Sequence, residues 1–168
     1  MSTVKEQQNK WVVSIADGKK LGEVKDVYFD SEVTKVAAIL VAVEGLFGRR
    51  FFGIAREAIQ VYGIDAWLVS ASDKVVDLDQ IPGSDAFIPV DDLRGRAIHS
   101  EGGTQIGVIE DILLDADTNV LGFTLSRVFA YGPLSERKTI ARAAITSLGR
   151  KDSSMTTILS QAESLVVS

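Results

Sequence analysis

Apolar and polar residues alternate along most of the chain in short runs, a pattern that is typical of β-strands. In the run that begins at Leu21, apolar residues fall at Val24, Val27 and Phe29, so strict alternation is broken by one residue. A β-bulge near position 25 would explain the break, because one extra residue resets which side chains face inward. The pattern therefore predicts a curved sheet.

The same run occurs a second time later in the chain. Residues 21–30 and 106–115 share the order apolar, Gly, any residue, Val or Ile, any residue, Asp, Val or Ile, any residue, Phe or Leu, Asp. A second pair of blocks, 54–59 and 140–145, matches after a one-residue insertion. Two matching blocks in the same order indicate an internal duplication.

Two glycines and two aspartates are identical in the copies. Gly22 and Gly107 stand where a strand begins, and a missing side chain there suits either the close approach of another backbone or a sharp bend. Asp26 and Asp111 follow at the position of the predicted bulge. We interpret these four residues as a structural motif.

An acidic tip follows each copy of the motif. Residues 30–32 read Asp-Ser-Glu and residues 115–117 read Asp-Ala-Asp. Two carboxylates in such a pattern could bind a hard cation, which prefers oxygen ligands. No calcium-loop spacing follows, and aspartate is a common turn residue, so the sequence favours a plain turn.

The segment 17–27 and its copy at 102–112 resemble the PRC-barrel family. This fold is shared by the cytoplasmic domain of the purple-bacterial reaction-centre H subunit and the C-terminal domain of a bacterial ribosome-maturation factor. The resemblance implies a mostly β protein built from two tandem small antiparallel β-barrels. Its motif is structural, so it carries information about fold more than about function.

Four segments follow from the duplication. We expect a flexible arm over residues 1–10, a first barrel over 11–72, a linker over 73–86 and a second barrel over 87–168. The linker contains several acidic residues and Pro82-Gly83, which mark irregular structure. Barrels of this size have small cores, so we expect the two barrels to pack together or to pair with another chain.

The third strand of the first unit differs from its copy. Residues 35–43 are apolar on both faces, whereas residues 120–128 alternate apolar residues with small or polar ones. The first barrel therefore has an extra apolar face, formed by Ala37, Ile39 and Val41, which should be covered by the second barrel or by another subunit.

Aromatic loops occupy equivalent places in the two copies. Aromatic and arginine side chains are enriched at protein interfaces. Aromatics beside arginine can also stack on single-stranded nucleic acid, and either Phe51 or Phe52 must point into the barrel. A core role for these aromatic residues is as well supported as a contact role, and between the two kinds of contact we favour protein over nucleic acid. The candidate contact residues on these loops are Leu46, Phe47, Arg49, Arg50, Phe129, Tyr131 and Leu134.

Composition narrows the functional classes. A formal net charge of −5 disfavours nucleic-acid binding, which usually requires a basic surface. The absence of cysteine excludes disulfides, zinc–thiolate centres and thiol catalysis. The first ten residues do not resemble an export signal, and the longest apolar run, 36–43, is too short to cross a bilayer as a helix. We therefore expect a cytoplasmic protein without a transmembrane segment.

No catalytic constellation is evident. His99 is the only histidine, and we place it in the turn before the second motif, as the counterpart of Ser14. Neither a nucleophile elbow nor a phosphate-binding loop is present. We expect no enzymatic activity, no catalytic or metal-binding residues and no cofactor.

These observations favour a non-catalytic protein-binding or assembly module whose partner is unknown. A homo-oligomer is one form that such binding could take, and the family resemblance adds a relation to photosynthetic complexes. The alternative is an RNA-associated or ribosome-associated assembly factor. That alternative would require Arg49, Arg50, Arg94 and Arg96 to form a basic patch on one surface.

Overall fold

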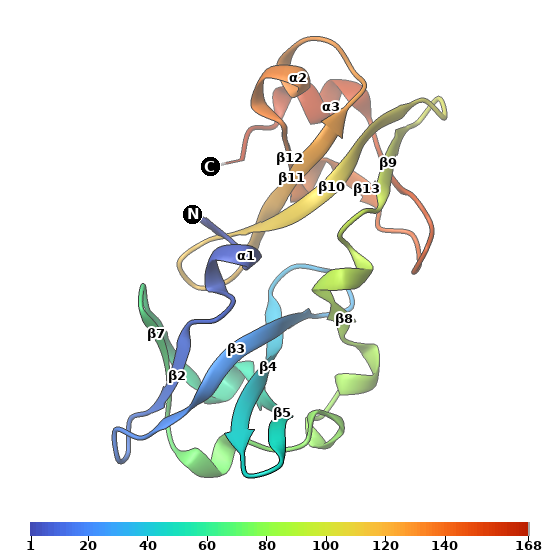
Figure 1. Ribbon diagram of the computed structural model, residues 1–168. Helices are drawn as coiled ribbons and strands as arrows, with labels where there is room; N and C mark the ends of the chain where they lie inside the picture. Colours follow the sequence, from blue (N-terminus) through green and yellow to red (C-terminus); the bar gives the residue numbers. More distant parts are fainter. Residues whose placement is uncertain (168) are drawn as a thin grey trace. The chain divides into compact units, whose positions relative to one another are not determined.

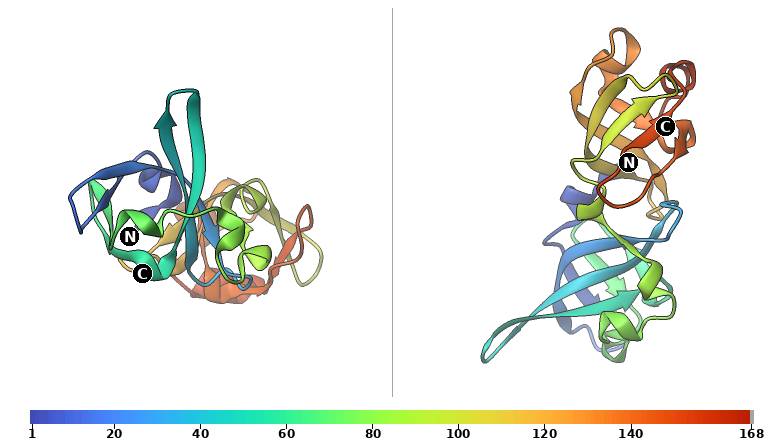
Figure 2. Two further views of the ribbon diagram at one scale, coloured as in Figure 1. Left: turned by 90° about the horizontal axis from the view of Figure 1, so that it is seen from below. Right: turned by 90° about the vertical axis from the view of Figure 1, so that its right-hand side faces the viewer.

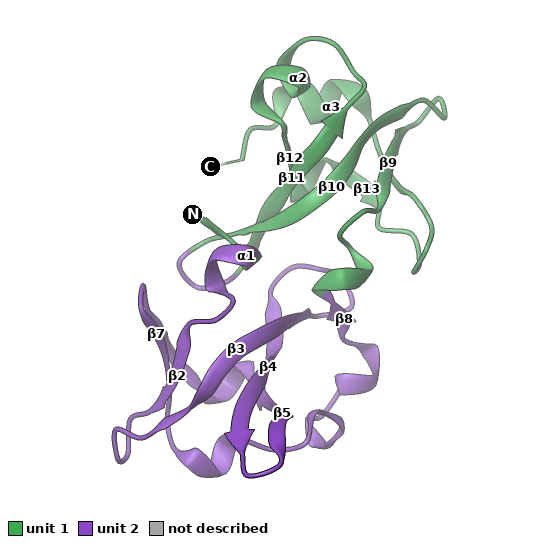
Figure 3. Cartoon of the chain, viewed as in Figure 1, with its two compact units in different colours: residues 1–4, 90–115, 119–168 green, residues 5–89, 116–118 purple. Residues whose placement is uncertain are grey.

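The structure is a computed structural model that describes residues 1–167, and they form two compact units (Figure 3). The N-terminal unit contains residues 5–89 and 116–118. The C-terminal unit contains residues 1–4, 90–115 and the chain from Asn119 onward. Each unit is built on a seven-stranded sheet, which confirms the prediction of a mostly β protein (Figure 1).

The sheet of the N-terminal unit has the strand order β5-β4-β3-β2-β7-β6, and β8 pairs with β3. Strands β2 and β7 are parallel, whereas its other pairs are antiparallel. The strands are β2 (Trp11–Ser14), β3 (Lys20–Phe29), β4 (Val36–Gly45), β5 (Gly48–Ala55), β6 (Ile59–Tyr62), β7 (Ala66–Val69) and β8 (Ile88–Pro89). The short helix α1 (Val4–Gln7) and the 3-10 turns η1 (Arg56–Ala58), η2 (Ser72–Lys74), η3 (Leu78–Gln80) and η4 (Ser84–Ala86) complete the elements.

The sheet of the C-terminal unit repeats this order as β12-β11-β10-β9-β14-β13, and β1 pairs with β10. Here the parallel pair is β9 with β14. The strands are β1 (Ser2–Thr3), β9 (Ala97–Ser100), β10 (Gln105–Leu114), β11 (Val120–Val128), β12 (Thr139–Ala141), β13 (Ile145–Ser147) and β14 (Met155–Thr157). Two helices, α2 (Pro133–Arg137) and α3 (Leu159–Ser164), and the turns η5 (Val90–Asp92) and η6 (Arg142–Ala144) accompany them.

Neither sheet closes into a complete barrel within residues 1–167. The path of the first sheet ends at β5 and β6, and that of the second ends at β12 and β13. In the first sheet the outer edge of β5 forms an isolated bridge with Val76 instead of pairing with another strand of the sheet. The Gly53 N–H donates to the Val76 carbonyl at 2.6 Å, and the Val76 N–H donates to the Gly53 carbonyl at 3.0 Å. The first sheet is therefore curved but open, and of the fold prediction only the mostly β character is confirmed here.

The predicted bulges are confirmed at equivalent positions. The register between β3 and β4 shifts between Val24 and Asp26, and that between β10 and β11 shifts between Ile109 and Asp111. The Asp111 carboxylate accepts a hydrogen bond from the Ile112 N–H at 2.9 Å, which holds the irregular backbone. The bulge resets the inward-facing residues, which is why the apolar spacing in the sequence breaks there.

Close backbone approach explains the paired glycines. A Cβ atom on Gly22 would overlap the carbonyl oxygen of Ala42, and one on Gly107 would lie 2.7 Å from the carbonyl oxygen of Arg127. In both cases the added atom would lie far closer to the carbonyl oxygen than van der Waals contact allows. The prediction of a steric requirement for glycine at Gly22 and Gly107 is confirmed.

The first ten residues and the segment before the second repeat contain more structure than the sequence indicates. Residues 1–10, expected as a flexible arm, include β1 and α1, and Val4 and Gln7 are buried. The side chain of Gln7 accepts a hydrogen bond from Trp67 Nε1 at 3.1 Å. Residues 73–86, expected as a linker, contain most of η2 and all of η3 and η4.

Each unit has its own apolar core. Trp67 is fully buried in the N-terminal unit, where its ring meets Tyr62 edge to face at 4.8 Å between centroids. Phe123 is fully buried in the C-terminal unit. The other large buried side chains of the first core are Phe29, Ile39 and Ile54, and those of the second include Ile98, Ile106, Ile109, Ile112, Leu114 and Leu134.

Candidate functional site

Strands β4 and β5 form a long hairpin that projects beyond the other strands of the N-terminal unit (Figure 2). Pairing between them runs from Ala38 opposite Ala55 to Gly45 opposite Gly48. On the other side of β4, pairing with β3 ends at Ala42 opposite Glu23. Residues 43–50 therefore pair only with each other. From here on we call residues 43–50 the arm, which is a different segment from the N-terminal residues 1–10.

The tip of the arm is apolar and fully solvated. Leu46 is 98% exposed and Phe47 is completely exposed. Neither has a positive φ, whereas Gly48 has a φ of +106°, so glycine provides the special conformation that the turn needs. Polar residues usually occupy such tips. The fold thus gives no reason for Leu46 and Phe47 to be apolar.

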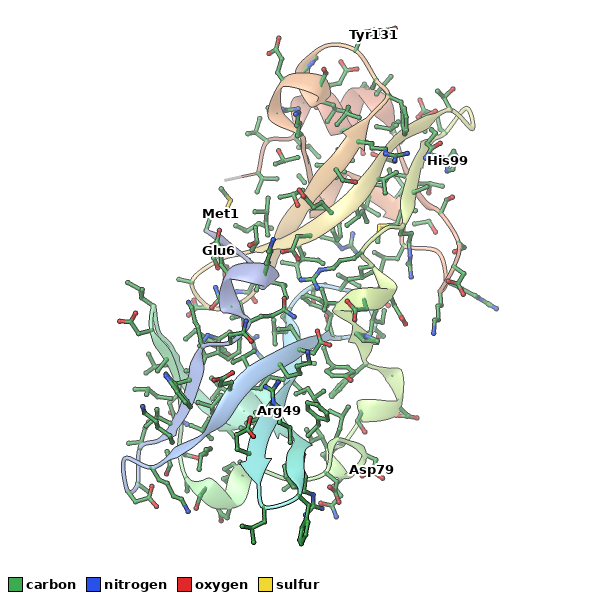
Figure 4. All side chains as sticks on the ribbon, in the orientation of Figure 1. Met1, Glu6, Arg49, Asp79, His99 and Tyr131 are labelled. Atoms are coloured by element: carbon green, nitrogen blue, oxygen red, sulfur yellow. The ribbon has the colours of Figure 1, made fainter. Side chains whose placement is uncertain are left out.

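Charged side chains flank the tip. Arg49 Nε lies 3.3 Å from Glu44 Oε1, and its Nη2 lies 3.9 Å from Glu23 Oε2 (Arg49 is labelled in Figure 4). The Arg50 guanidinium lies 5.3 Å from the centre of the Phe52 ring. Ion pairs as exposed as these contribute little to folding, so Arg49 and Glu44 can exchange partners at small cost.

A row of directly opposed residues crosses the sheet below the arm. Trp11 lies opposite Glu23, Glu23 opposite Ala42, and Ala42 opposite Phe51. Opposed residues share one face of a sheet, and both ends of this row are aromatic and about half exposed. Lys20 Nζ lies 4.3 Å from the Trp11 ring centre.

A shallow groove of about 300 Å³ runs along the same part of the sheet. Its walls combine an exposed aromatic ring, aliphatic side chains and charges of both signs. The lining residues are Trp11, Lys20, Leu21, Gly22, Glu23, Ala42, Val43, Glu44 and Arg49. We call the arm, this groove and Phe51 together the contact face.

The aromatic loop of the C-terminal unit is only partly a surface feature. Tyr131 is 94% exposed and Phe129 is half exposed (Tyr131 is labelled in Figure 4). Leu134, however, is completely buried on α2, so its assignment as a contact residue is wrong. A Pro–Leu sequence after a glycine begins a helix here, and the leucine packs inward.

The predicted apolar face of β4 is also core rather than free surface. Ile39 and Val41 are completely buried, and Ala37 is half-buried. Ile39 lies opposite Val27 and Val41 opposite Val24, and these two valines are buried as well. Since the chain already covers this face, Ala37, Ile39 and Val41 are not available as an exposed contact.

Two of the four arginines of the proposed basic patch, Arg94 and Arg96, are already engaged within the C-terminal unit. Arg94 Nη2 lies 3.2 Å from the buried Asp111 carboxylate. Arg96 is buried and donates to the backbone carbonyls of Leu148 and Asp92, both at 2.8 Å. Burial lowers the pKa of the Arg96 guanidinium, against the opposing effects of Asp92 and Asp152. These contacts stabilise loops of the C-terminal unit.

His99 lies in strand β9 and not, as the sequence predicts, in the turn before the second motif (Figure 4). It is opposite Gln105 on β10 and Thr156 on β14. Ser100, rather than His99, takes the place of Ser14, because its N–H bonds to the Thr104 carbonyl as that of Ser14 bonds to Lys19. The hairpin of the second copy is one residue shorter, which shifts the alignment.

The acidic tips serve as turn acceptors. Asp30 Oδ1 accepts hydrogen bonds from the Thr34 and Lys35 N–H groups at 2.7 and 3.1 Å. Asp115 accepts from the Asn119 backbone at 2.8 Å and from its side-chain amide at 3.1 Å. Among residues 1–167, no group of three or more His, Cys, Asp or Glu side chains is placed to hold a metal ion.

Comparison with known proteins identifies the N-terminal unit. Residues 4–79 match the family model of the PRC-barrel domain. No curated protein matches the chain. In the part of the chain that the structure describes, no helix is both long and apolar enough to cross a membrane.

Proposed function

We propose that the chain, in which residues 4–79 form a PRC-barrel domain, is a non-catalytic protein-binding or assembly module that binds through the contact face. We further propose that the second sheet is a second barrel of the same type. Its identical strand order and the equivalent bulge at Asp111 support this interpretation.

One observation carries the binding proposal, namely the fully exposed pair Leu46 and Phe47 at the end of a projecting hairpin. Each apolar Å² kept in water costs about 25 cal/mol relative to burial. A large apolar side chain at an exposed tip is favoured where a partner removes it from water. Trp11 and Phe51 extend the apolar surface along the same sheet.

A protein partner suits this surface better than RNA. The contact face has acidic as well as basic groups, since Glu23 and Glu44 lie beside Arg49. Phosphate backbones require a surplus of free cations, and Arg94 and Arg96 are paired or buried. Mixed charge around aromatic anchors is typical of protein interfaces.

The family resemblance suggests where partners should be sought. Large assemblies, including photosynthetic complexes, are the first group to test, because the reaction-centre H subunit has this type of barrel. Ribosome assembly particles form the second group.

Cross-linking in native cells tests the proposal. The full chain, its Phe47→Asp variant and the matched control Ile64→Asp would each be cross-linked and purified, and the captured proteins identified. Ile64 is 87% exposed on the β6–β7 turn, so it matches Phe47 in exposure but lies outside the contact face. We expect Phe47→Asp alone to lose specific partners. Equal capture by all three proteins would show that the arm is not the binding element.

A further inference from the structure

We propose that one occupant of the contact face is a second copy of this chain, with the tip of each arm seated in the groove of the other copy. This inference rests on the proposed function and names the partner. It makes the same surface the interface of a symmetric homodimer.

The contact face contains both halves of a self-complementary contact. A two-fold interface uses one patch on both subunits, so the patch must contain a knob and a matching depression. Leu46 and Phe47 form the knob, and the groove beside Trp11, Leu21 and Val43 forms the depression. Both belong to the same unit and to neighbouring strands.

The charges on the contact face also complement a second copy. Arg50 forms no ion pair with a carboxylate of the described residues, and its guanidinium lies on the Phe52 ring. Glu44 is 79% exposed in its side chain, and Glu23 lies inside the groove. When an arm enters the groove of the other copy, its Arg50 approaches these acids and competes for them with Arg49, which lies 3.3 Å from Glu44 and 3.9 Å from Glu23. Each copy supplies both partners, so two equivalent ion pairs form.

A membrane surface fits less well. Basic side chains near an apolar tip favour anionic lipids, but Glu23 and Glu44 offset two of the three basic residues on this face, which are Lys20, Arg49 and Arg50. The chain also has a net charge of −5, which opposes approach to an anionic surface. A second copy uses the acids as well as the bases, whereas an anionic headgroup layer repels the acids.

The available area is sufficient for a reversible dimer. A whole aromatic side chain buries about 150–250 Å². On that scale the exposed apolar surface is on the order of 500 Å² per copy, summed over Trp11, Leu46, Phe47 and Phe51. A standard interface buries about 800 Å² per partner. The apolar part thus covers more than half of that area, and the charged residues around the groove can supply the rest.

Analytical ultracentrifugation over a wide range of protein concentration measures the association directly. We expect a monomer–dimer equilibrium for the unaltered chain. Phe47→Asp should raise the dimer dissociation constant about tenfold or more, because it places a charge in the apolar contact. Ile64→Asp should leave the constant unchanged. Equal thermal melts of the two variants would show that both are folded.

Single cysteines test the geometry, since the chain has no cysteine of its own. We expect a mixture of Phe47→Cys and Leu21→Cys chains to form a disulfide-linked dimer under mild oxidation. A mixture of Phe47→Cys with Ile64→Cys chains should form far less.

Three outcomes would overturn the dimer. They are a monomer at every concentration, a dimer that Phe47→Asp does not weaken, and cross-linking that is equal in the two cysteine mixtures. Co-sedimentation of a monomeric chain with vesicles of phosphatidylcholine and phosphatidylserine would assign the tip to lipid instead. A monomer whose capture of host proteins still depends on Phe47 would reject self-association and leave the binding function in place.

Discussion

The two units differ in the segment that follows β4 in one unit and β11 in the other. In the N-terminal unit, β4 continues into the arm and returns as β5, so Leu46 stands in water at the tip. In the C-terminal unit, β11 ends at Val128 and the chain forms α2, whose Leu134 is completely buried. The segment after these two strands thus exposes a leucine in one unit and buries one in the other.

Local contacts explain why the second segment stays folded against its own unit. Arg137 at the end of α2 donates to the backbone carbonyls of Ala162 and Glu163 at 3.2 and 2.7 Å. Lys138 then adopts the left-handed conformation, and its N–H bonds to the Leu134 carbonyl at 2.8 Å. Among the described residues, the arm is held by its own strand pairing and by the exposed contact of Arg49 with Glu23 on β3. The two units therefore share the bulged strands and differ at the edge, where one has a solvated hairpin and the other a packed helix.

Replacing the two leucines by alanine should separate these roles most clearly. Leu134→Ala removes a buried side chain and leaves a cavity, so we expect it to lower the free energy of unfolding by about 2–5 kcal/mol. Leu46→Ala removes only solvated atoms and should change stability by less than about 0.5 kcal/mol. Chemical denaturation of both variants measures the difference. Equal losses would mean that the arm packs against the protein.

The glycines test what the two units have in common. Valine at Gly22 meets the Ala42 carbonyl, and valine at Gly107 meets the Arg127 carbonyl. We expect each variant to lose about 1–3 kcal/mol, with the larger loss at Gly22, where the approach is closer. Lys19→Val, at an exposed turn, is the control. Thermal melts in which both glycine variants match this control would remove the close-approach argument.

The motif aspartates should differ in their contributions. Asp111 is buried and accepts hydrogen bonds from Arg94 and from the Ile112 N–H. Asp26 is only half-buried, and Gln8 Nε2 lies 3.5 Å from its Oδ1. We expect Asp111→Ala to cost about 1–3 kcal/mol, because it leaves buried donors without an acceptor, and Asp26→Ala to cost less. Denaturation curves of the two variants, measured side by side, would contradict this ranking if Asp26→Ala lost more.

The features that the sequence predicted correctly depend on a residue and its near neighbours in one strand. The break in alternation after Val24 and the shared glycines predicted the bulges and the close approaches, because both are steric consequences of a residue and its neighbours. It also identified the exposed apolar pair at the tip of the arm. The exposure of that pair follows from a turn between two glycines, which is readable locally.

The errors arose where distant segments decide burial. The sequence predicts that Ile39 and Val41 lie on an extra face covered by the second barrel or another subunit. Both belong to the core of their own unit, because their inward orientation depends on pairing with Val27 and Val24. The pairing of β1 with β10 and of β8 with β3 joins segments far apart in sequence, and strands of two residues leave no readable period. Leu134 was misassigned because a five-residue helix gives no periodic signal.

The smallest expected effect concerns the hairpin before each motif. In the first copy, Asp17 Oδ1 accepts the Lys19 N–H at 3.0 Å, and the shorter turn of the second copy has glycine in its place. The Lys19 backbone hydrogen bond, followed by the Ser14 side chain, holds the pKa of Asp17 below its usual value of 3.8. A lowered pKa means that the folded state favours the carboxylate.

The stabilisation from Asp17 is therefore complete above the ordinary aspartate pKa and is lost as the pH falls through the lower pKa of the folded state. We expect the Lys19 amide resonance to titrate with a midpoint below 3.8 in an NMR pH series. Asp17→Asn should abolish that titration, whereas the Thr104 amide of the second hairpin should not follow it in either protein. A midpoint at or above the ordinary value would show that the Asp17 contact does not persist in solution. The two hairpins would then behave alike, although only the first has the acid.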